Sequence, residues 1–177
     1  MKNIAIEERA KNGVDIERGA PAIKQQPRSK RCYFDVAIGS VCLTGADTGG
    51  AYCLLEVSLA PGIGVPRHTH TREDETYYVT AGELEVIVGD QRFVLKEGDA
   101  LMAPRDIPHE LRNSGGTTNH YLLLFSPSGF ENFVMATALA ARDNAVAPTE
   151  RQLRDGDPAM AIQKVHELAT KYGILFS

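Results

Sequence analysis

Four side chains of the types that hold transition metals fall in two short stretches of the sequence. His68 and His70 are separated by one residue, so a β-strand through them projects both imidazoles onto the same face. Glu75 follows the charged stretch 71–74, which can turn the chain so that Glu75 opens the neighbouring strand and faces the same interior. His109 leads a further strand after a proline-punctuated turn, and it joins the other three if the sheets fold over each other. The spacing therefore predicts a cluster of three imidazoles and one carboxylate.

Such a cluster suits a divalent first-row transition metal, with one or two coordination positions left for water or substrate. Imidazole and carboxylate ligands accept Mn, Fe, Co, Ni, Cu or Zn, so the residue types leave the identity of the metal open. A single strand histidine is more often a packed or surface residue than a ligand. Four residues of ligand type together favour metal ligation by His68, His70, Glu75 and His109.

The neighbouring acids and the remaining histidines are weaker candidates. Glu73 and Asp74 precede Glu75, but Glu75 stands at the expected start of a strand, so we expect the other two to be solvated in the loop. His120 begins a strand outside either cluster, and His166 lies on a predicted helix away from its apolar stripe. Both histidines are expected to face solvent.

The elements around these residues have the pattern of an all-β domain. From residue 32 to 126, short apolar runs recur roughly every eight to twelve residues and are separated by turn residues, which is typical of a sandwich or barrel. Gly89 and Asp90 form a two-residue hairpin turn of the kind that needs positive φ. The expected strands cover residues 40–44, 52–59, 65–70, 75–80, 83–88, 92–95, 100–103, 109–112 and 121–125.

After residue 125 the apolar period becomes helical. Ser128 and Glu131 have the spacing of a capping box at a helix start. The apolar face that follows comprises Phe130, Phe133, Val134, Ala138 and Ala141. A second helix is expected from Asp157 and Pro158 to a C-terminal cap at Gly173. Its stripe comprises Ile162, Val165, Leu168, Ala169 and Tyr172. We expect both helices to pack outside the barrel.

Length and composition limit the class of protein. The chain has 177 residues with 43% apolar and 24% charged residues, which predicts one packed domain. We divide it into an arm (1–31), a barrel (32–127) and a helical extension (128–177). The net charge of −4 argues against nucleic acid as the main partner. The sequence has no apolar run of the roughly 18 residues a membrane span needs and no signal-like start, so we expect a cytoplasmic protein without a membrane partner.

The three cysteines carry no recognisable motif. Cys32, Cys42 and Cys53 lie ten and eleven residues apart, which fits neither a zinc knuckle nor an obvious disulfide framework. We interpret them as reduced thiols on strands.

Both ligand clusters resemble the paired motifs of the cupin family. The first motif is matched by Gly62, His68, Thr69, His70, Glu75 and Gly82, and the second by Gly98, Pro104, His109 and Asn113. The resemblance implies a conical double-stranded β-helix, or jelly-roll, barrel in which His68, His70, Glu75 and His109 bind the metal. Asp106 stands where the family usually has glycine, which predicts a distorted turn before His109.

Flanking segments narrow the resemblance to single-domain cupins of the quercetin-dioxygenase-like group. Segments 45–50, 72–75 and 126–131 are similar to that group, and the likeness covers roughly residues 40 to 135. It implies a metal-dependent dioxygenase that acts on a small aromatic or enol-bearing molecule, with dioxygen as second substrate. In such an enzyme Glu75 accepts the proton of a substrate hydroxyl. Cupins of this kind are often homodimers.

Two other functions stay open. The same metal acting as a Lewis acid would make a cyclase or isomerase of a polyketide-like or carbonyl compound, without oxygen consumption. A non-catalytic barrel would only bind a small molecule. Thiol dioxygenases are disfavoured because the resemblance there is to a site of three histidines without a carboxylate. Residues expected to line a substrate pocket are Tyr77, Val79, Met102, Leu123 and Phe125.

Overall fold

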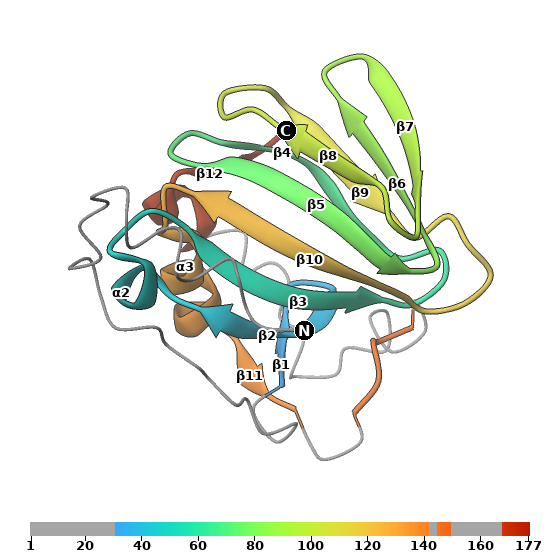
Figure 1. The fold of residues 1–177 in the computed structure, drawn as a ribbon, viewed down its shortest axis with the longest axis horizontal. Coiled ribbons are helices and arrows are strands. Elements are labelled where there is room, and N and C mark those ends of the chain that lie inside the picture. The colour runs from blue at the N-terminus through green and yellow to red at the C-terminus, as the bar shows by residue number, and fades with distance from the viewer. Residues whose placement is uncertain (1–30, 142–144, 150–167) are drawn as a thin grey trace, which may run out of the picture.

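The computed structural model describes residues 31–141, 145–149 and 168–177. In these ranges the strands form two antiparallel sheets that face each other as a jelly roll (Figure 1), which confirms the predicted all-β class. The larger sheet has the order β11 (Leu139–Ala140), β1 (Cys32–Phe34), β2 (Ala37–Leu43), β3 (Cys53–Leu59), β10 (Asn119–Ser126), β5 (Asp74–Ala81) and β8 (Ala100–Ala103). The smaller sheet has the order β12 (Ile174–Phe176), β4 (Gly64–His70), β9 (His109–Arg112), β6 (Glu83–Val88) and β7 (Gln91–Lys96).

Every predicted strand coincides with one of these strands, and the bounds differ by a few residues at most. Three short strands and one short helix, α2 (Gly45–Thr48), were not predicted. β1 and β11 have three and two residues, which is too short for an alternating pattern to show. β12 has three residues and follows the helix end after Gly173 alone, so it is also too short for an alternating pattern to show.

Alternation along β10 and β5 builds the core between the sheets. Alternate residues of β10 are buried, among them Leu123 and Phe125, and the register places them opposite Tyr77 and Glu75 of β5. Tyr77 and Phe125 are completely buried. Burying one large apolar side chain contributes about 1.5–3 kcal/mol, so a one-residue slip in this pairing is strongly disfavoured. This register fixes Glu75 as an inward-facing residue.

Helix α3 (Phe130–Thr137) begins one residue later than the capping box predicted. Its N-cap is Gly129, not Ser128, because the Glu131 carboxylate accepts the backbone N–H of Gly129 at 2.7 Å. The other oxygen of Glu131 accepts the N–H of Gly45 at 2.8 Å. Glu131 is therefore a buried link between α3 and α2.

The same helix ends earlier than expected. Ala138 is extended, and the next two residues form β11, which pairs with β1. Ala141 then donates its N–H to the carbonyl of Arg31 at 3.0 Å. The prediction that Ala138 and Ala141 belong to the helix was wrong because a strand edge supplied better backbone partners than another helical turn.

The described C-terminal segment ends a helix and adds a strand. Residues 168–169 are helical and continue into η4 (Thr170–Tyr172), and Gly173 caps the turn with a φ of 82°, as predicted. β12 follows and pairs with β4, so that Phe176 lies opposite His68. The predicted start of this helix at residues 157–158 lies outside the described residues.

The cysteines lie on strands and are unpaired, as predicted. Cys32, Cys42 and Cys53 belong to β1, β2 and β3. Burial raises the pKa of each thiol, and that of Cys53 reaches about 12 because the Glu131 carboxylate adds to the effect. These thiols are therefore protonated and poorly reactive at neutral pH. No helix in the described ranges is long and apolar enough to cross a membrane.

Candidate metal centre

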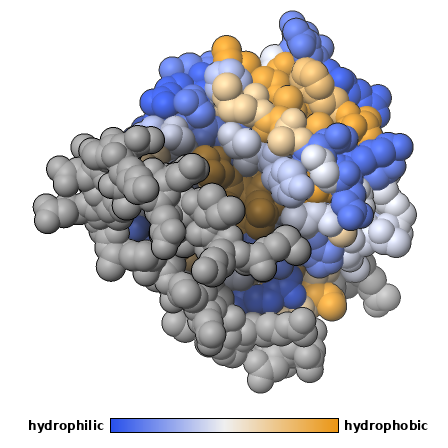
Figure 2. All heavy atoms as spheres, viewed as in Figure 1, coloured by the Kyte–Doolittle hydropathy of each residue, from blue (hydrophilic) through white to orange (hydrophobic). Residues whose placement is uncertain are grey.

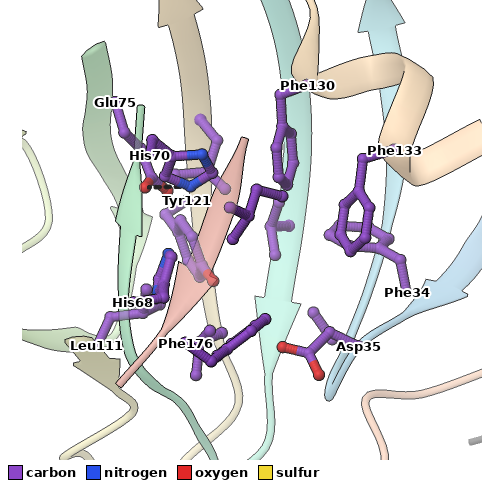
Figure 3. A pocket seen from close by; sticks show the side chains of 15 residues that line it. Phe34, Asp35, His68, His70, Glu75, Leu111, Tyr121, Phe130, Phe133 and Phe176 are labelled. Carbon is purple, nitrogen blue, oxygen red and sulfur yellow. Dashed lines mark ion pairs between the residues drawn. The ribbon is translucent and has the colours of Figure 1, made fainter. Parts of the chain in front are cut away.

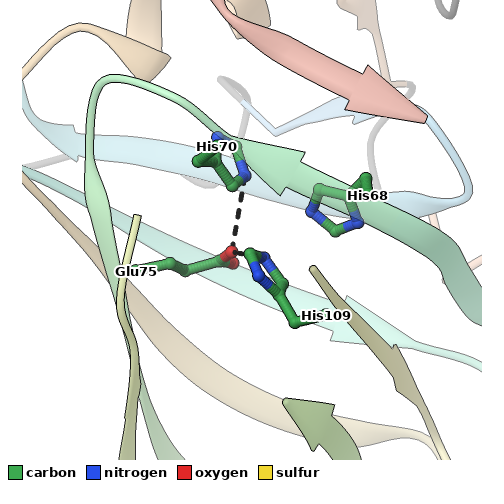
Figure 4. A group of neighbouring side chains, drawn as sticks. All are labelled: His68, His70, Glu75 and His109. Carbon is green, nitrogen blue, oxygen red and sulfur yellow. Dashed lines mark hydrogen bonds and ion pairs between the residues drawn. The ribbon is translucent and has the colours of Figure 1, made fainter. Parts of the chain in front are cut away.

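The strands bring the four predicted ligands together inside the barrel (Figure 4). His68 and His70 share the buried face of β4, and His109 of β9 lies directly opposite His68 in the register. Glu75 comes from β5 in the facing sheet. One ligand atom of each residue lies within 4.8 Å of a ligand atom of every other. All four side chains are buried.

Backbone carbonyls orient two of the imidazoles. Nδ1 of His68 lies 2.9 Å from the Pro66 carbonyl oxygen, and Nδ1 of His109 lies 2.9 Å from that of Ile107. A carbonyl only accepts, so both Nδ1 atoms carry a proton. In the neutral ring the lone pair is then on Nε2, the nitrogen available to a metal.

Glu75 is held in its ionised form among the histidines. Its Oε2 lies 2.9 Å from Nε2 of His109 and 3.4 Å from Nε2 of His70. Burial alone would raise the pKa of Glu75, but the hydrogen bond from His109 and the charges of the surrounding histidines outweigh it and lower the pKa to about 2. The site therefore presents a carboxylate at neutral pH.

The histidines divide into two electrostatic classes. Burial lowers the pKa of His68 and takes that of His70 to about 3, although the charge of Glu75 acts in the opposite direction. Burial also acts to lower the pKa of His109, but the hydrogen bond and charge of Glu75 outweigh it and raise the pKa. His68 and His70 are thus neutral. The negative charge of Glu75, which stabilises a proton on His109, would also stabilise a metal cation between these side chains.

The donor set fits a first-row transition metal. Two ligand atoms at about 2.0–2.2 Å from one ion and at right angles to each other are separated by about 3 Å. The separations from Glu75 Oε2 to the two histidine nitrogens, 2.9 Å and 3.4 Å, are close to this value. His68, His70, Glu75 and His109 are therefore the residues that would hold the ion.

The prediction that Glu73 and Asp74 are both solvated in a loop was wrong for Glu73. Glu73 is buried, with 3% of its surface exposed, and one of its carboxylate oxygens lies 4.0 Å from Nδ1 of His70. Burial raises the pKa of Glu73 to about 7, although the charge of Arg72 lowers it in part. Asp74 opens β5 at the surface and forms an ion pair with Arg105 at 2.9 Å.

The other histidines lie away from the cluster. His120 is partly buried on β10, and its Nδ1 is 2.8 Å from the Ser58 hydroxyl, so it is less open to solvent than expected. The difference arises because β10 is an interior strand of the sheet, and its neighbour β3 supplies a hydroxyl beside the ring. His166 lies outside the described residues.

Asp106 keeps the turn before His109 intact. Its φ is +64°, the left-handed conformation that glycine adopts readily and that aspartate tolerates better than most residues. The Asp106 N–H donates to the carbonyl of His70 at 2.8 Å, which ties this turn to the ligand strand β4. The expected distortion is therefore absent.

Three of the four ligands, His68, His70 and Glu75, line an apolar cavity (Figure 3) of about 50 Å³. Besides ligands, the barrel contributes Ala37, Val57, Val65, Leu111, Tyr121 and Leu123. Segments outside the predicted strands contribute Phe34, Asp35, Phe130, Phe133, Ile174 and Phe176. Among the described residues that line the cavity there is no lysine and no arginine.

Of the five expected pocket residues, the structure places only one on the cavity wall. Leu123 lines the cavity, whereas Tyr77, Val79 and Phe125 are buried in the core beside it. Met102 is 51% exposed on the outside of the barrel. The register explains this placement, because Ala103 pairs with inward-facing Glu75, so its neighbour Met102 must face outward.

Four phenylalanines that line the cavity were not predicted as pocket residues: Phe34, Phe130, Phe133 and Phe176. We call these four residues the cavity rim. Phe130 and Phe133 lie on the apolar stripe of α3, a signal that the sequence did carry but that also fits packing on the barrel surface. Phe34 and Phe176 belong to β1 and β12 and had no periodic signal. Phe176 lies beside the metal centre, with its ring centroid 5.6 Å from that of His68.

Comparisons with known proteins agree with this fold and site. A cupin-domain family model matches residues 55–125. Protein SchB of Streptomyces halstedii is 35% identical over 95 residues, which cover 53% of this chain and 67% of SchB. Quercetin 2,3-dioxygenase of Bacillus subtilis (strain 168) is 27% identical over 92 residues, which cover 52% of this chain and 27% of that enzyme. The polyketide cyclase RemF of Streptomyces resistomycificus superposes with a TM-score of 0.51 at 19% identity, over 60% of this chain and 81% of RemF, and shows the fold alone.

The chain therefore belongs to the cupin family, and a quercetin dioxygenase is among its relatives. The matched region spans two thirds of SchB but only about a quarter of the quercetin dioxygenase. Family membership and the ligand cluster together define a cupin with a candidate metal centre.

Proposed function

We propose that this protein is a metal-dependent cupin enzyme, a dioxygenase-like oxidoreductase that acts on a small aromatic or enol-bearing molecule. The observation that carries the proposal is a buried cluster of three histidines and one carboxylate, of which His68, His70 and Glu75 line a cavity walled by aromatic rings. The relationship to a quercetin 2,3-dioxygenase supports it.

The metal would be held by the Nε2 atoms of His68, His70 and His109 and by the carboxylate of Glu75. When bound, it supplies a positive charge that lowers the pKa of a substrate hydroxyl, and a redox-active ion also supplies open positions for dioxygen. The ligand types accept Mn, Fe, Co, Ni, Cu or Zn. The ordered histidines bring this set together before any ion arrives, which reduces the entropy lost on binding.

Glu75 is proposed as the group that takes the substrate proton. Its carboxylate lies on the cavity wall and is ionised, so it can accept a proton from a hydroxyl placed beside it. Tyr121 lines the same cavity, and burial together with the nearby carboxylate keeps its pKa well above the usual value. Tyr121 therefore stays a neutral hydrogen-bond donor and leaves the base role to Glu75.

The cavity walls favour a flat apolar substrate. Phe34, Phe130, Phe133 and Phe176 offer ring faces and edges, against which an aromatic ligand gains stacking and burial energy. The described lining has no cationic side chain, so a substrate with several carboxylates would find no counter-charge other than the metal. A neutral phenol or enol fits these walls better than a sugar acid or a dicarboxylic acid.

Oxygen uptake tests the proposal. The metal content is first measured on protein purified without a histidine tag, and the flavonol quercetin and simpler enols are then offered in an oxygen electrode. We expect uptake by the wild type and its loss in Glu75→Gln, which keeps the shape of the side chain and most of the metal but removes the base. Unchanged turnover in Glu75→Gln would exclude the base role.

A cyclase or isomerase is the second candidate, because a metal and the Glu75 base can move a proton without any oxidant. Such an enzyme converts a polyketide-like or carbonyl substrate while the oxygen concentration stays constant. A third possibility, a non-catalytic binding protein, would return its ligand intact after prolonged incubation. Oxygen consumption and ligand recovery therefore separate the three.

We also propose a homodimer, formed by the outer face of the larger sheet. The registers align Leu54, Leu124, Thr76 and Met102 in one row across four strands. Met102 and Tyr78 are 51% and 45% exposed, and Figure 2 shows apolar side chains gathered over β5 and β8 on this face. Light scattering tests the mass, and Met102→Glu is expected to give monomers. A cytoplasmic location stays a prediction.

A further inference from the structure

The three histidines of the candidate metal centre are not oriented in the same way. His68 and His109 each hold their Nδ1 proton against a carbonyl oxygen two residues earlier on the chain, at 2.9 Å in both cases. His70 has no such carbonyl: its Nδ1 is buried and has no hydrogen-bond partner among the described residues. One of the three rings therefore lacks the support that fixes the other two.

The orientation of the His70 ring is nevertheless determined. Its Nε2 faces Glu75 at 3.4 Å, and the ring packs edge-on against Phe125 and Phe130 at centroid distances of 5.2 Å and 5.3 Å. Figure 4 shows the other nitrogen of this ring pointing away from the remaining ligands. If Nε2 binds a metal, Nδ1 must carry the proton and needs an acceptor in a place that water does not reach.

Glu73 is the acceptor in that place. Its Oε2 lies 4.0 Å from Nδ1 of His70, and this oxygen is also buried without a hydrogen-bond partner among the described residues. A buried donor and a buried acceptor, each unsatisfied, thus face each other across a gap about 1 Å longer than a hydrogen bond. Each unsatisfied group destabilises the fold, so a movement that closes the gap is favourable.

The chain around Glu73 leaves room for this carboxylate and for little else. A Cβ atom on Gly129 would lie 2.5 Å from Glu73 Oε1, so the absence of a side chain at the N-cap of α3 makes space for the carboxylate. The next acid, Asp74, points to the surface and pairs with Arg105. Glu73 is therefore directed to His70 by its surroundings, while its neighbour in the sequence is not.

We propose that Glu73 is a positioning residue of the metal centre, which accepts the Nδ1 proton of His70 when His70 Nε2 binds the ion. The contact fixes the tautomer of His70 and completes a set in which all three histidines have an acceptor behind them. Glu73 acts through His70 and does not touch the substrate. This role rests on the metal centre proposed above.

Metal affinity and stability of the metal-free protein test this role. Cobalt(II) is titrated into full-length wild type, Glu73→Leu, Glu73→Gln and the control Asp74→Asn, against a chelator of known affinity, and its absorption spectrum reports the ligand geometry. We expect Glu73→Leu to bind cobalt about 10–100-fold more weakly, and Glu73→Gln, whose amide oxygen still accepts, to lose clearly less. Asp74→Asn is expected to bind like wild type.

The melting temperature without metal separates positioning from a structural role. Because Leu removes a buried carboxylate oxygen, Oε2, that has no hydrogen-bond partner among the described residues, the metal-free Glu73→Leu protein is expected to melt at or above the wild-type temperature. Wild-type affinity in Glu73→Leu, an equal loss in Asp74→Asn, or a weaker affinity that comes with a lower melting temperature without metal would each overturn the proposal. Failure of the wild type to bind cobalt would instead overturn the metal centre itself, and with it the role of Glu73.

Discussion

The metal centre and the rim of the cavity are built from different kinds of sequence. The ligands lie on β4, β5 and β9, regular strands of the barrel whose alternation directs each side chain inward. The aromatic rim comes from β1, α3 and β12, short elements that flank the barrel strands in the sequence. In the proposed enzyme, metal binding and substrate contact would thus depend largely on separate segments, so the rim could change its shape without moving a ligand.

Removal of the proposed metal is expected to have the largest effect on stability and activity. It acts on the barrel strands, because all four ligands lie on β4, β5 and β9. An ion present at about 1,000 times its Kd stabilises the folded protein by about 4 kcal/mol, which is about 8–16 °C in Tm for a chain of this size. We therefore expect a chelator to lower Tm by roughly 10 °C and to abolish turnover, with both restored by the missing ion. Scanning calorimetry checks the first effect.

His109→Ala is the matched control for metal removal. It lacks one ligand and the hydrogen-bond partner of Glu75, so its Tm is expected to respond weakly to metal or chelator. A His109→Ala protein that gains as much Tm from the ion as wild type does would show that the stabilising metal binds elsewhere.

The same contrast explains how much could be predicted from the sequence. Short apolar runs separated by turn residues predicted the barrel strands, and His68, His70 and Glu75 lie close together in the chain, so local spacing was enough to predict that they face one interior. His109 joined them only on the further expectation that the sheets fold over each other. The burial of Glu73 depends on Gly129, the N-cap of a helix far away in the sequence, whereas the neighbouring residues of Glu73 are charged and suggested solvent exposure. Phe176 lines the cavity only because β12 pairs with β4, and three residues carry too little pattern to reveal that.

Gly129→Ala is expected to destabilise the protein where the N-cap of α3, beside the cavity rim, contacts Glu73, beside the metal centre. Gly129 has a φ of +155° and lies against the Glu73 carboxylate, so a side chain there meets both backbone strain and a close contact. Strain of this kind costs about 1–3 kcal/mol, and urea unfolding measures it. Gly116→Ala is the control, because a Cβ there meets nothing within 4 Å.

A double variant sharpens this prediction. Combining Gly129→Ala with Glu73→Ala removes the close contact but not the backbone strain, so we expect the two effects to be less than additive. Strict additivity would mean that Gly129 and Glu73 do not interact and that the rim helix leaves the metal centre unaffected.

Phe176→Ala is expected to weaken substrate binding while metal binding stays the same. Phe176 lines the cavity beside His68 but is not a ligand, so its loss removes an aromatic contact worth about 1–1.5 kcal/mol, or roughly tenfold in Kd. Quercetin binding without oxygen measures this change. Leu175→Ala, the adjacent and 45% exposed residue of β12, is expected to bind quercetin like wild type. Loss of metal in Phe176→Ala would contradict the separation of rim and centre.

Asp106→Gly is expected to have the smallest effect, although Asp106 is the position at which the cupin motif is broken. The left-handed φ of +64° strains an aspartate, and glycine relieves that strain. Glycine also gains freedom in the unfolded chain, which opposes the benefit by about 0.4–1 kcal/mol, so the net change in stability is small. Metal affinity should not change, because the N–H that binds the His70 carbonyl is retained. Asp106→Val keeps the same N–H but is β-branched, so it should destabilise the turn before His109 and weaken metal binding. If Gly and Val behaved alike, backbone conformation would not be what this position supplies, and the aspartate side chain would have to be.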